Sequence, residues 1–232
     1  MSAFTLSKST YIRGLQCLKS LYLNKYRPFL RDKLSEEQLA KFSRGHEIGK
    51  LARQLFPGGV EIPRPSVASA NRTHQEIVNG TPVIYEACFI HSEIIVAVDI
   101  LVKHENGWNA YEVKSSGQLS DTYFSDARLQ EYVIRGTGLP LCKFFLVYRD
   151  TSIELSDTKD THKLFIFNEL TMPDPGMLVQ IESDISRMKT TLQLPKSPAV
   201  IPGKHCMYPY PCDFRGVCWK NLTEEEVSLL VI

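Results

Sequence analysis

The sequence predicts an α/β fold in which helices flank a central mixed β-sheet. Three observations support this fold class. The chain has 232 residues, of which 43% are apolar, enough to form one sizeable core. Its predicted helices and strands follow one another along the chain rather than falling into separate blocks. Finally, two strand-like runs flank Asn106-Gly107, and Asn-Gly between such runs is a strong hairpin signal.

Three helices are predicted before the sheet, over residues 7–25, 35–56 and 66–79. The second opens with the capping box Ser35-Glu36-Glu37-Gln38 and is expected to end before Pro57. Asn79-Gly80 is expected to close the third. His46 lies on the apolar face of the second helix, so we expect it to point inward or along a cleft. Glu47 lies about 100° further round that helix and is expected at the surface.

The predicted hairpin brings three charged residues onto one face of the sheet. If its turn has two residues, at Asn106-Gly107, Asp99 lies opposite Lys114, and Glu112 shares the face of Lys114 because side chains alternate along a strand. An aspartate inside an apolar run is costly to bury unless it is paired or bound to a metal. Two interpretations stay open: a divalent-cation site shared by the two carboxylates, or a buried Asp99–Lys114 ion pair beside an ordinary edge glutamate.

The other elements complete the sheet and cover it. A strand over residues 83–90 precedes the hairpin, and we expect its Glu86 to face solvent rather than to act as a further acidic ligand. The hairpin is followed by a predicted helix over 121–135, a buried strand over 141–148, an edge strand over 161–168 and a helix over 173–191.

Charge and hydropathy narrow the class of protein. The net charge is +1, so the total charge does not indicate nucleic-acid binding. Residues 1–33 carry seven basic residues against one aspartate, a net charge of +6, which suits either a phosphate-binding surface or a solvated helix face. We expect no export signal and no membrane anchor, and hence a cytoplasmic location, because neither an apolar leader core nor a long uncharged apolar run occurs.

Four of the six cysteines indicate a metal site. Cys88 and Cys142 lie in apolar strand-like runs and are expected to be buried free thiols. From residue 194 the chain becomes rich in proline and holds three cysteines with the spacing C-x5-C-x5-C. With no export signal, metal ligation is favoured over disulfides. Cys17 is expected to be the fourth ligand and to join the two ends of the chain, and the proposed ligands are Cys17, Cys206, Cys212 and Cys218.

The ordered set of polar residues resembles a known family. Asp99, the run Glu112-Val113-Lys114, an earlier helical His46 and a later helical Gln130 together resemble the PD-(D/E)XK nucleases of the RecB-like branch. One cysteine near the N-terminus and three near the C-terminus resemble its iron–sulfur members, which include the small CRISPR-associated exonucleases and AddB-type nuclease domains. The resemblance covers residues 7–220 and implies a restriction-endonuclease-like core with a C-terminal tail stapled by a metal cluster.

The resemblance also implies roles for individual residues. His46, Asp99 and Glu112 would be ligands of Mg²⁺ or Mn²⁺, with the backbone carbonyl of Val113. The catalytic group would be Lys114, with Asp99, Glu112 and Gln130 as further catalytic residues. The family pattern Gln-x-x-x-Tyr is not met, because position 134 is Ile; Tyr132 is the nearest tyrosine and is the expected substrate-binding residue.

The cysteine spacing departs from the family pattern as well. C-x2-C-x5-C is the better-known spacing, whereas this chain has C-x5-C-x5-C. A [4Fe-4S] cluster is the expected cofactor, with Zn²⁺ as the alternative and His205 as an alternative ligand. Aromatic and basic residues interleave around these cysteines and would either stack single-stranded bases or pack around the metal: Lys204, Tyr208, Tyr210, Phe214, Arg215, Trp219 and Lys220.

The expected function is hydrolysis of DNA by a divalent-metal-dependent nuclease. An exonuclease acting on single-stranded DNA is favoured, the cluster is expected to be structural, and the expected partners beyond DNA are CRISPR adaptation or repair proteins. Two alternatives remain open: a catalytically silent DNA-binding or scaffold subunit, and a zinc-stapled binding module. The expected organisation is a segment 1–34 that supplies one cysteine, a nuclease core 35–193 and a Cys-rich segment 194–232 that packs on the first helix.

Overall fold

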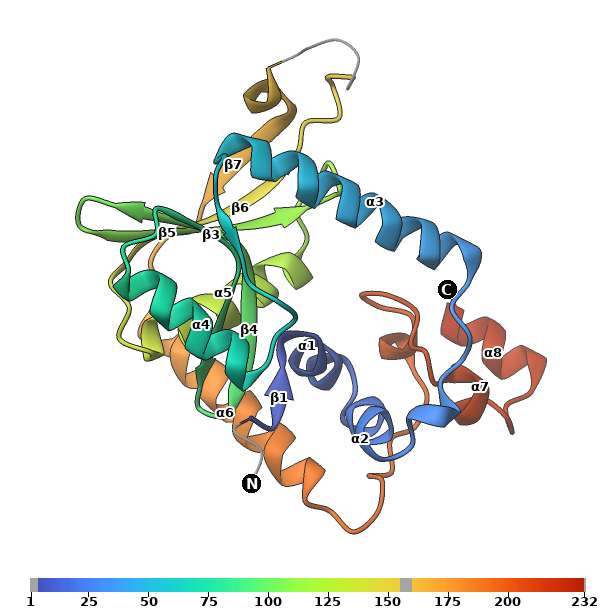
Figure 1. The fold of residues 1–232 in the computed structure, drawn as a ribbon. Helices are drawn as coiled ribbons and strands as arrows, with labels where there is room; N and C mark the ends of the chain where they lie inside the picture. The colour runs from blue at the N-terminus through green and yellow to red at the C-terminus, as the bar shows by residue number, and fades with distance from the viewer. Residues whose placement is uncertain (1–3, 155–159, 232) are drawn as a thin grey trace. The chain divides into compact units, whose positions relative to one another are not determined.

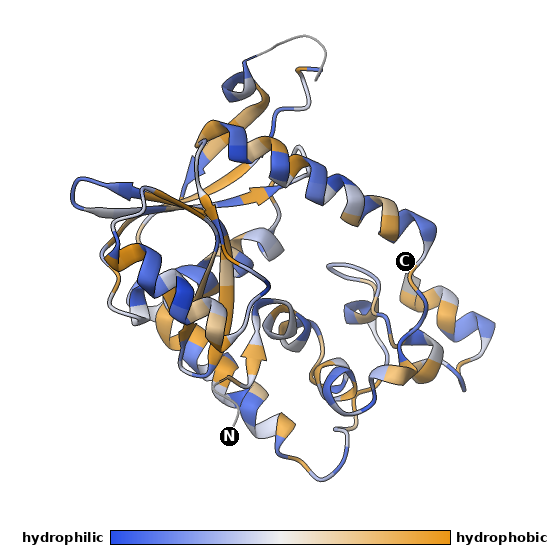
Figure 2. Ribbon diagram, in the orientation of Figure 1, coloured by the Kyte–Doolittle hydropathy of each residue, from blue (hydrophilic) through white to orange (hydrophobic). Residues whose placement is uncertain are grey.

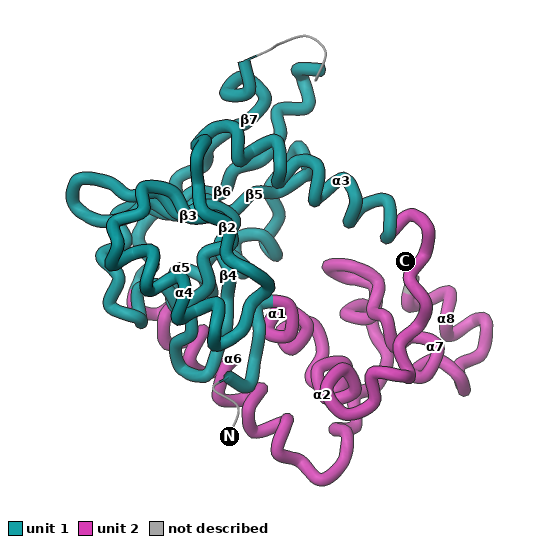
Figure 3. The backbone as a smooth tube through the Cα atoms, viewed as in Figure 1, with its two compact units in different colours: residues 1–8, 39–174 teal, residues 9–38, 175–232 magenta. Residues whose placement is uncertain are grey.

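The computed structural model describes residues 4–154 and 160–231. The chain forms two compact units, each made of segments far apart in the sequence (Figure 3). Unit 1 consists of residues 1–8 and 39–174, and unit 2 consists of residues 9–38 and 175–232. Unit 2 therefore contains residues from both ends of the chain together with residues 175–193. The expected organisation placed residues 175–193 in the nuclease core.

Unit 1 contains one mixed sheet. The strands lie in the order β2-β3-β4-β5-β6-β7, and β1 pairs with β4 in parallel. Pairs β2–β3 and β5–β6 are parallel, while β3–β4, β4–β5 and β6–β7 are antiparallel. The prediction of a mixed α/β fold is confirmed. The strands are β1 (Leu6–Ser7), β2 (Val60–Glu61), β3 (Val83–His91), β4 (Ile94–His104), β5 (Gly107–Lys114), β6 (Leu141–Arg149) and β7 (Phe165–Glu169) (Figure 1).

The hairpin β4–β5 exists, but its register differs from the predicted one. His104 pairs with Gly107 and Ile100 with Tyr111, so the turn lies at Glu105-Asn106 and Asp99 is aligned with Glu112 rather than with Lys114. The predicted pairing was wrong by two residues because the chain turns just before the glycine. A shift of two keeps every side chain on its face. The grouping of the two carboxylates and the lysine on one face therefore survives.

The two faces of the sheet have different partners. One face packs Ile100, Tyr111 and Val147 against Ile48 and Ala52 of α3 (Glu36–Ala52). The opposite face carries Glu112 and Lys114 and is covered by α5 (Asp121–Gly136), which contacts β3, β4 and β6. Figure 2 shows that hydrophobic residues concentrate on the central strands. The charged hairpin residues thus lie on the face toward α5.

The predicted boundaries hold for α3 and α4 (Val67–Val78). In the capping box of α3, Ser35 N–H donates to Gln38 Oε1 at 2.9 Å and Gln38 N–H donates to Ser35 Oγ at 3.2 Å. Ser66 caps α4, and Gly80, with φ 76°, follows its end. The predicted edge strand begins late, because residues Thr161–Leu164 form a 3-10 turn before β7.

Unit 2 contains the helices of both chain ends. The single helix predicted over residues 7–25 is wrong: α1 (Lys8–Gln16) and α2 (Leu18–Tyr26) are separated at Cys17, whose φ of −162° and ψ of 118° are extended. A Cβ on Gly14 would lie 2.5 Å from Met188 Sδ, so the Met188 side chain would have to move if a larger residue stood where α1 meets α6 (Pro175–Leu192). The C-terminal helices are α7 (Arg215–Cys218) and α8 (Glu224–Val231). Across the described residues, no helix is both long and apolar enough to span a membrane.

Candidate functional site

A cluster of four charged side chains lies between β5 and α5 in unit 1. Lys8 Nζ lies 2.7 Å and Lys114 Nζ 2.8 Å from the same oxygen, Glu112 Oε1. Lys114 Nζ also forms a short ion pair with Asp126 Oδ2, and Lys8 Nζ lies 3.7 Å from that oxygen. Only 3% of the Glu112 side chain and 12% of the Lys114 side chain are exposed, so these pairs lie largely away from solvent.

Asp99 adjoins this cluster from the neighbouring strand. Its Oδ2 accepts a hydrogen bond of 2.6 Å from the backbone N–H of Val113, and the β4–β5 register aligns it with Glu112. Burial, together with the negative charge of Glu112, raises the pKa of Asp99 to about 8. Two carboxylates held side by side in this way repel each other, and a bound cation would remove that repulsion.

Glu112 has the opposite electrostatic environment. Burial alone would raise its pKa, but the ammonium groups of Lys114 and Lys8 outweigh burial and hold the pKa of Glu112 well below its usual range. The pKa of Lys114 is raised: burial opposes the shift, and the carboxylates of Glu112 and Asp126 produce it. Glu112 and Lys114 are therefore both charged at neutral pH.

Glu86 occupies an unusual position in the middle of β3. Its φ of 56° is in the left-handed region, which costs on the order of 1 kcal/mol or more for a residue with a side chain. The flanking pairs Tyr85–Ile100 and Ala87–Val98 place it at the level of Asp99, and its Oε1 lies 3.1 Å from Arg53 Nη2. Burial raises the pKa of Glu86, against the effect of Arg53. Glu86 is half-buried at the edge of the cluster, rather than fully facing solvent as expected.

Several buried polar atoms of this region have no hydrogen-bond partner. They are Glu112 Oε2, Asp126 Oδ1, and both Nε2 and Oε1 of Gln130. Gln130 is completely buried on α5, one helical turn after Asp126. A buried amide with neither atom satisfied is rare and calls for an explanation such as a bound ion or a catalytic role. Gln130 therefore shares a helix face with Asp126, which belongs to the charged cluster.

Two other predicted site residues lie elsewhere in unit 1. His46 is exposed on α3, where its Nδ1 lies 2.9 Å from the carbonyl oxygen of Phe42. The expectation that it points inward is wrong, because only the Ile48 and Ala52 side of this helix is buried. Tyr132 packs edge-on against His91, and its hydroxyl lies 3.2 Å from Ser92 Oγ, at the β3–β4 turn.

The chemistry of the donor atoms suits a hard divalent cation. Asp99 and Glu112 supply carboxylate oxygens, and Glu112 Oε2 has an unused buried lone pair. Among the described residues, however, no group of three or more His, Cys, Asp or Glu side chains is arranged to hold a metal ion. In this structure the two lysines provide the positive charge that Glu112 requires.

The four predicted cluster cysteines line one pocket in unit 2. Cys17 comes from the break between α1 and α2, and the other three come from the C-terminal segment: Cys206, Cys212 and Cys218. His205 lines the same pocket, with its Nε2 3.7 Å from Cys206 Sγ. Burial raises the pKa of the Cys17 and Cys218 thiols. Lys19 and Arg215 also line the pocket and would offset the negative charge of ligating thiolates.

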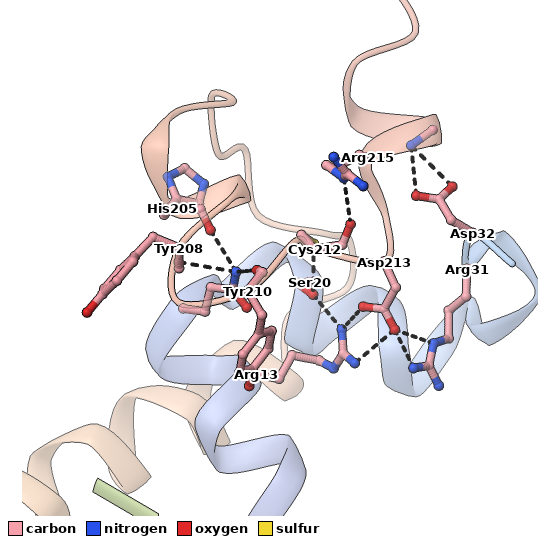
Figure 4. Close-up of polar contacts among 12 residues, drawn as sticks. Arg13, Ser20, Arg31, Asp32, His205, Tyr208, Tyr210, Cys212, Asp213 and Arg215 are labelled. Carbon is pink, nitrogen blue, oxygen red and sulfur yellow. Dashed lines mark hydrogen bonds and ion pairs between the residues drawn. The ribbon is translucent and has the colours of Figure 1, made fainter. Parts of the chain in front are cut away.

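Polar contacts fix the C-terminal segment around this pocket (Figure 4). Asp213 accepts hydrogen bonds from both Arg13 and Arg31, and burial is outweighed by these guanidinium groups, which hold the pKa of Asp213 low. Gln16 Nε2 donates to the carbonyl oxygens of His205, at 2.8 Å, and of Tyr208 and Tyr210. The C-terminal segment therefore packs on α1 and α2 through bonds that need no metal.

The aromatic residues around the cysteines divide into two groups. Phe214 is fully buried with Leu23 and Cys212, so it packs around the pocket. Tyr208 and Tyr210 are 66% and 41% exposed. Trp219 is half-buried, and Arg215 lies over its ring at 5.4 Å. Of these four aromatic residues, the two tyrosines present the rings that are open enough for a stacked base.

Lys8 and Asp126 were missed by the sequence analysis. Asp126 could have been found, because it precedes the predicted Gln130 by four residues and must share its helix face. Lys8 could not, since its position depends on the two-residue strand β1, which pairs Leu6 and Ser7 with Ile94 and Ile95 of β4. A strand of two residues leaves no periodic signal.

No protein-family model and no curated protein matches the chain. The crystal structure of SSO0001 matches with a TM-score of 0.38 and 15% identity, over 94% of this chain and 87% of that chain. The crystal structure of a phage-related exonuclease from Haemophilus somnus 129PT matches with a TM-score of 0.31 and 11% identity, over 76% of this chain and 92% of that one. Similarity at these TM-scores carries no argument about activity.

Proposed function

We propose that this protein is a divalent-metal-dependent deoxyribonuclease with a restriction-endonuclease-like core. One observation carries the proposal. A mixed sheet brings Asp99, Glu112 and Lys114 to one face beneath α5, where Gln130 and Glu112 Oε2 are buried without partners. Buried charges and unsatisfied polar atoms are costly to a fold and cluster at functional sites.

Asp99 and Glu112 would hold Mg²⁺ or Mn²⁺, with the carbonyl of Val113 and with His46 as further ligands. When bound, the cation would polarise the scissile phosphate and lower the pKa of a water molecule. The Val113 N–H bond to Asp99 fixes that carboxylate beside the preceding residue, Glu112. The proposed ligand set needs His46 to leave its present exposed position.

Lys114 and Gln130 are the proposed catalytic groups that do not bind the cation. Lys114 keeps its charge at neutral pH because Glu112 and Asp126 raise its pKa. It would stabilise negative charge that develops on the phosphate during hydrolysis. Gln130 is buried next to Asp126 on α5 and would orient the attacking water or the lysine.

In unit 2 the proposed cofactor is a [4Fe-4S] cluster bound by Cys17, Cys206, Cys212 and Cys218. The shared pocket of the four thiols and its basic lining support this proposal. Zn²⁺ is the alternative metal, and His205 is the alternative ligand, since it lines the same pocket. The proposed role is structural.

The proposed substrate is single-stranded DNA, degraded from an end, in DNA repair or CRISPR adaptation. The exposed rings of Tyr208 and Tyr210 support a single-stranded substrate, because unpaired bases stack on aromatic rings. Tyr132 is the further proposed substrate-binding residue.

The test compares purified protein with two variants, Lys114→Ala and Glu112→Ala. End-labelled single-stranded and duplex DNA are incubated with Mn²⁺, Mg²⁺ or EDTA, and the products are separated by size. We expect metal-dependent shortening of single strands by the wild-type protein and none by either variant. Lys143→Ala is the matched control, because Lys143 forms an exposed pair with Glu169 on the same sheet.

A second function is favoured by the ion pairs themselves. Two ammonium groups already satisfy Glu112 Oε1, and His46 is exposed, as expected of a silent DNA-binding or scaffold subunit. This alternative predicts DNA binding without cleavage in any divalent metal. Intact DNA in every reaction, with retained binding, would replace the nuclease proposal by this one.

A further inference from the structure

Lys8 is the least expected member of the charged cluster. It is the first residue of α1 and directly follows β1, whose parallel pairing with β4 fixes the backbone at this point. Its Nζ lies 2.7 Å from Glu112 Oε1, the oxygen that Lys114 also contacts. A carboxylate oxygen has two lone pairs, and here both are occupied by ammonium groups.

The two lysines are not equivalent. Lys114 is 12% exposed and forms its short second pair with Asp126 Oδ2, whereas Lys8 is 30% exposed and lies 3.7 Å from that oxygen. Lys114 is therefore anchored at two carboxylates. Lys8 has one firm contact and an open side toward solvent, so it can leave Glu112 at a smaller cost.

A divalent cation on Glu112 would stand within a few ångströms of both ammonium groups. Two unit charges of like sign about 4 Å apart repel by roughly 4 kcal/mol near a protein surface, and a divalent ion doubles this. A cation on the free Oε2 atom of Glu112 would repel both ammonium groups on Oε1. The group held least firmly moves, which is Lys8.

We propose that Lys8 is a phosphate-binding residue that occupies Glu112 until a divalent cation arrives and then binds a non-bridging oxygen of the nucleic-acid backbone. An ammonium group displaced by a few ångströms from the cation site stands where the charge of a bound phosphodiester needs a counterion. The inference rests on the proposed function, since it assumes a cation and a phosphodiester at this site. Lys8 thus acts in addition to Lys114 and does not replace it.

The first test measures Mn²⁺ binding by calorimetry, without DNA, to wild-type protein, Lys8→Met and the matched control Lys143→Met. Removal of a competing positive charge should tighten Mn²⁺ binding by Lys8→Met about tenfold and leave the control unchanged. The same variant should bind a single-stranded oligonucleotide about tenfold more weakly in Ca²⁺. Unchanged or weaker Mn²⁺ binding, or unchanged oligonucleotide binding, would overturn the proposal.

A second measurement uses the wild-type chain and so avoids any folding defect of the variant. Reductive methylation, read by peptide mass spectrometry, should modify Lys8 several-fold faster once Mn²⁺ is added and slow again with oligonucleotide, while Lys114 and Lys143 keep their rates. A Lys8 rate that ignores Mn²⁺ would contradict the proposal. These readouts do not require cleavage, so an inactive wild-type protein would refute the nuclease function separately.

Discussion

The charged cluster of unit 1 and the cysteine pocket of unit 2 both contain candidate metal ligands, but the two regions are stabilised by different contacts. In the cluster, the candidate metal ligand Glu112 is already neutralised by two lysines. In the pocket, four cysteines are among the lining residues, and the surrounding segment is fixed by bonds from Arg13, Gln16 and Arg31 that involve no thiol. In the charged cluster, ion pairs hold the candidate ligand itself. In the pocket, these bonds hold the chain segment that carries the cysteines.

This difference teaches where each metal should matter. A carboxylate paired with lysine keeps a counter-charge when no cation is bound, so the charge of Glu112 is compensated in either state. Buried thiols gain no comparable partners until a metal binds, and a ligated metal contributes directly to folding free energy. We therefore expect the divalent cation of unit 1 to control activity and the proposed metal of unit 2 to control stability.

The largest expected effect is a loss of cleavage activity without a change in unit 2. Glu112→Gln keeps the shape of the side chain but removes the charge that a cation needs, so Mn²⁺-dependent cleavage should fall on the order of 1000-fold. The absorption near ~400 nm expected of the proposed [4Fe-4S] cluster should be unchanged, because the pocket cysteines belong to the other unit. Gel assays and a visible spectrum of the same anaerobic sample check both. Loss of the absorption together with cleavage would show that the two regions are not independent.

Cys212→Ser should have the reverse effect. Removal of one proposed ligand should release the metal and lower the free energy of unfolding by about 3 kcal/mol or more. Metal analysis and thermal unfolding measure the two changes. Cys142→Ser is the matched control, since Cys142 is a half-buried free cysteine of β6 and lines no part of the pocket. Equal metal content in the two variants would exclude Cys212 as a ligand.

Asp213→Asn weakens the metal-independent contacts of unit 2. Two arginines would lose their charged partner, and we expect a loss of about 2 kcal/mol, seen as faster proteolysis of the C-terminal segment. The pKa of Asp213 is low in the folded state, so its contribution is present above the usual aspartate pKa and is lost as the pH falls through the folded value. A variant whose proteolysis matches the wild type at neutral pH would mean that the Asp213 ion pairs do not hold the segment.

Asp99→Asn tests how the electrostatics of the charged cluster affect stability. The pKa of Asp99 is raised to about 8, so the folded state keeps a proton that the unfolded chain loses near pH 4. In EDTA, stability from this group should therefore fall as the pH rises from about 4 to about 8, and the variant should be more stable by roughly 1–2 kcal/mol at the upper end. Denaturant unfolding at several pH values measures this slope. The same slope in both proteins would remove Asp99 as its cause.

The smallest effect concerns the exposed ring of Tyr208. Tyr208→Ala should weaken binding of single-stranded DNA by about 1 kcal/mol, because one stacking platform is lost, and should leave duplex binding and stability unchanged. Fluorescence anisotropy with the two substrates provides the comparison. Phe214→Ala is the contrasting variant, since its ring is buried and should affect stability instead.

The sequence predicts the grouping of Asp99, Glu112 and Lys114 because alternation along strands is robust to a shift of two residues. It also places Gln130 on the correct helix. The orientation of His46 could not be read in the same way, since which side of α3 is buried depends on tertiary packing against Tyr85 and Ile100. The hairpin register depends on where the turn forms, one residue before the expected place.

The helix break at Cys17 and the position of Lys8 are also tertiary effects. Nothing in the local pattern interrupts the helix at Cys17, whose extended backbone is the point where the thiol enters the pocket. Lys8 joins the charged cluster only because β1 adds to β4, which lies far along the chain. Local propensity is overridden at both places by contacts with residues that the pattern cannot see.

The three bonds from Gln16 to the C-terminal segment have a consequence for the order of events on the ribosome. The amide and the carbonyl of His205 are separated by 189 positions in the chain, which at about 5–20 residues per second take roughly 10–40 s to synthesise. During that interval Gln16 cannot form its bonds to the C-terminal segment, and three of the four pocket cysteines have not been synthesised. The metal that we propose for unit 2 would therefore be inserted only as a late step of biogenesis, after the residues of the unit 1 sheet have been synthesised.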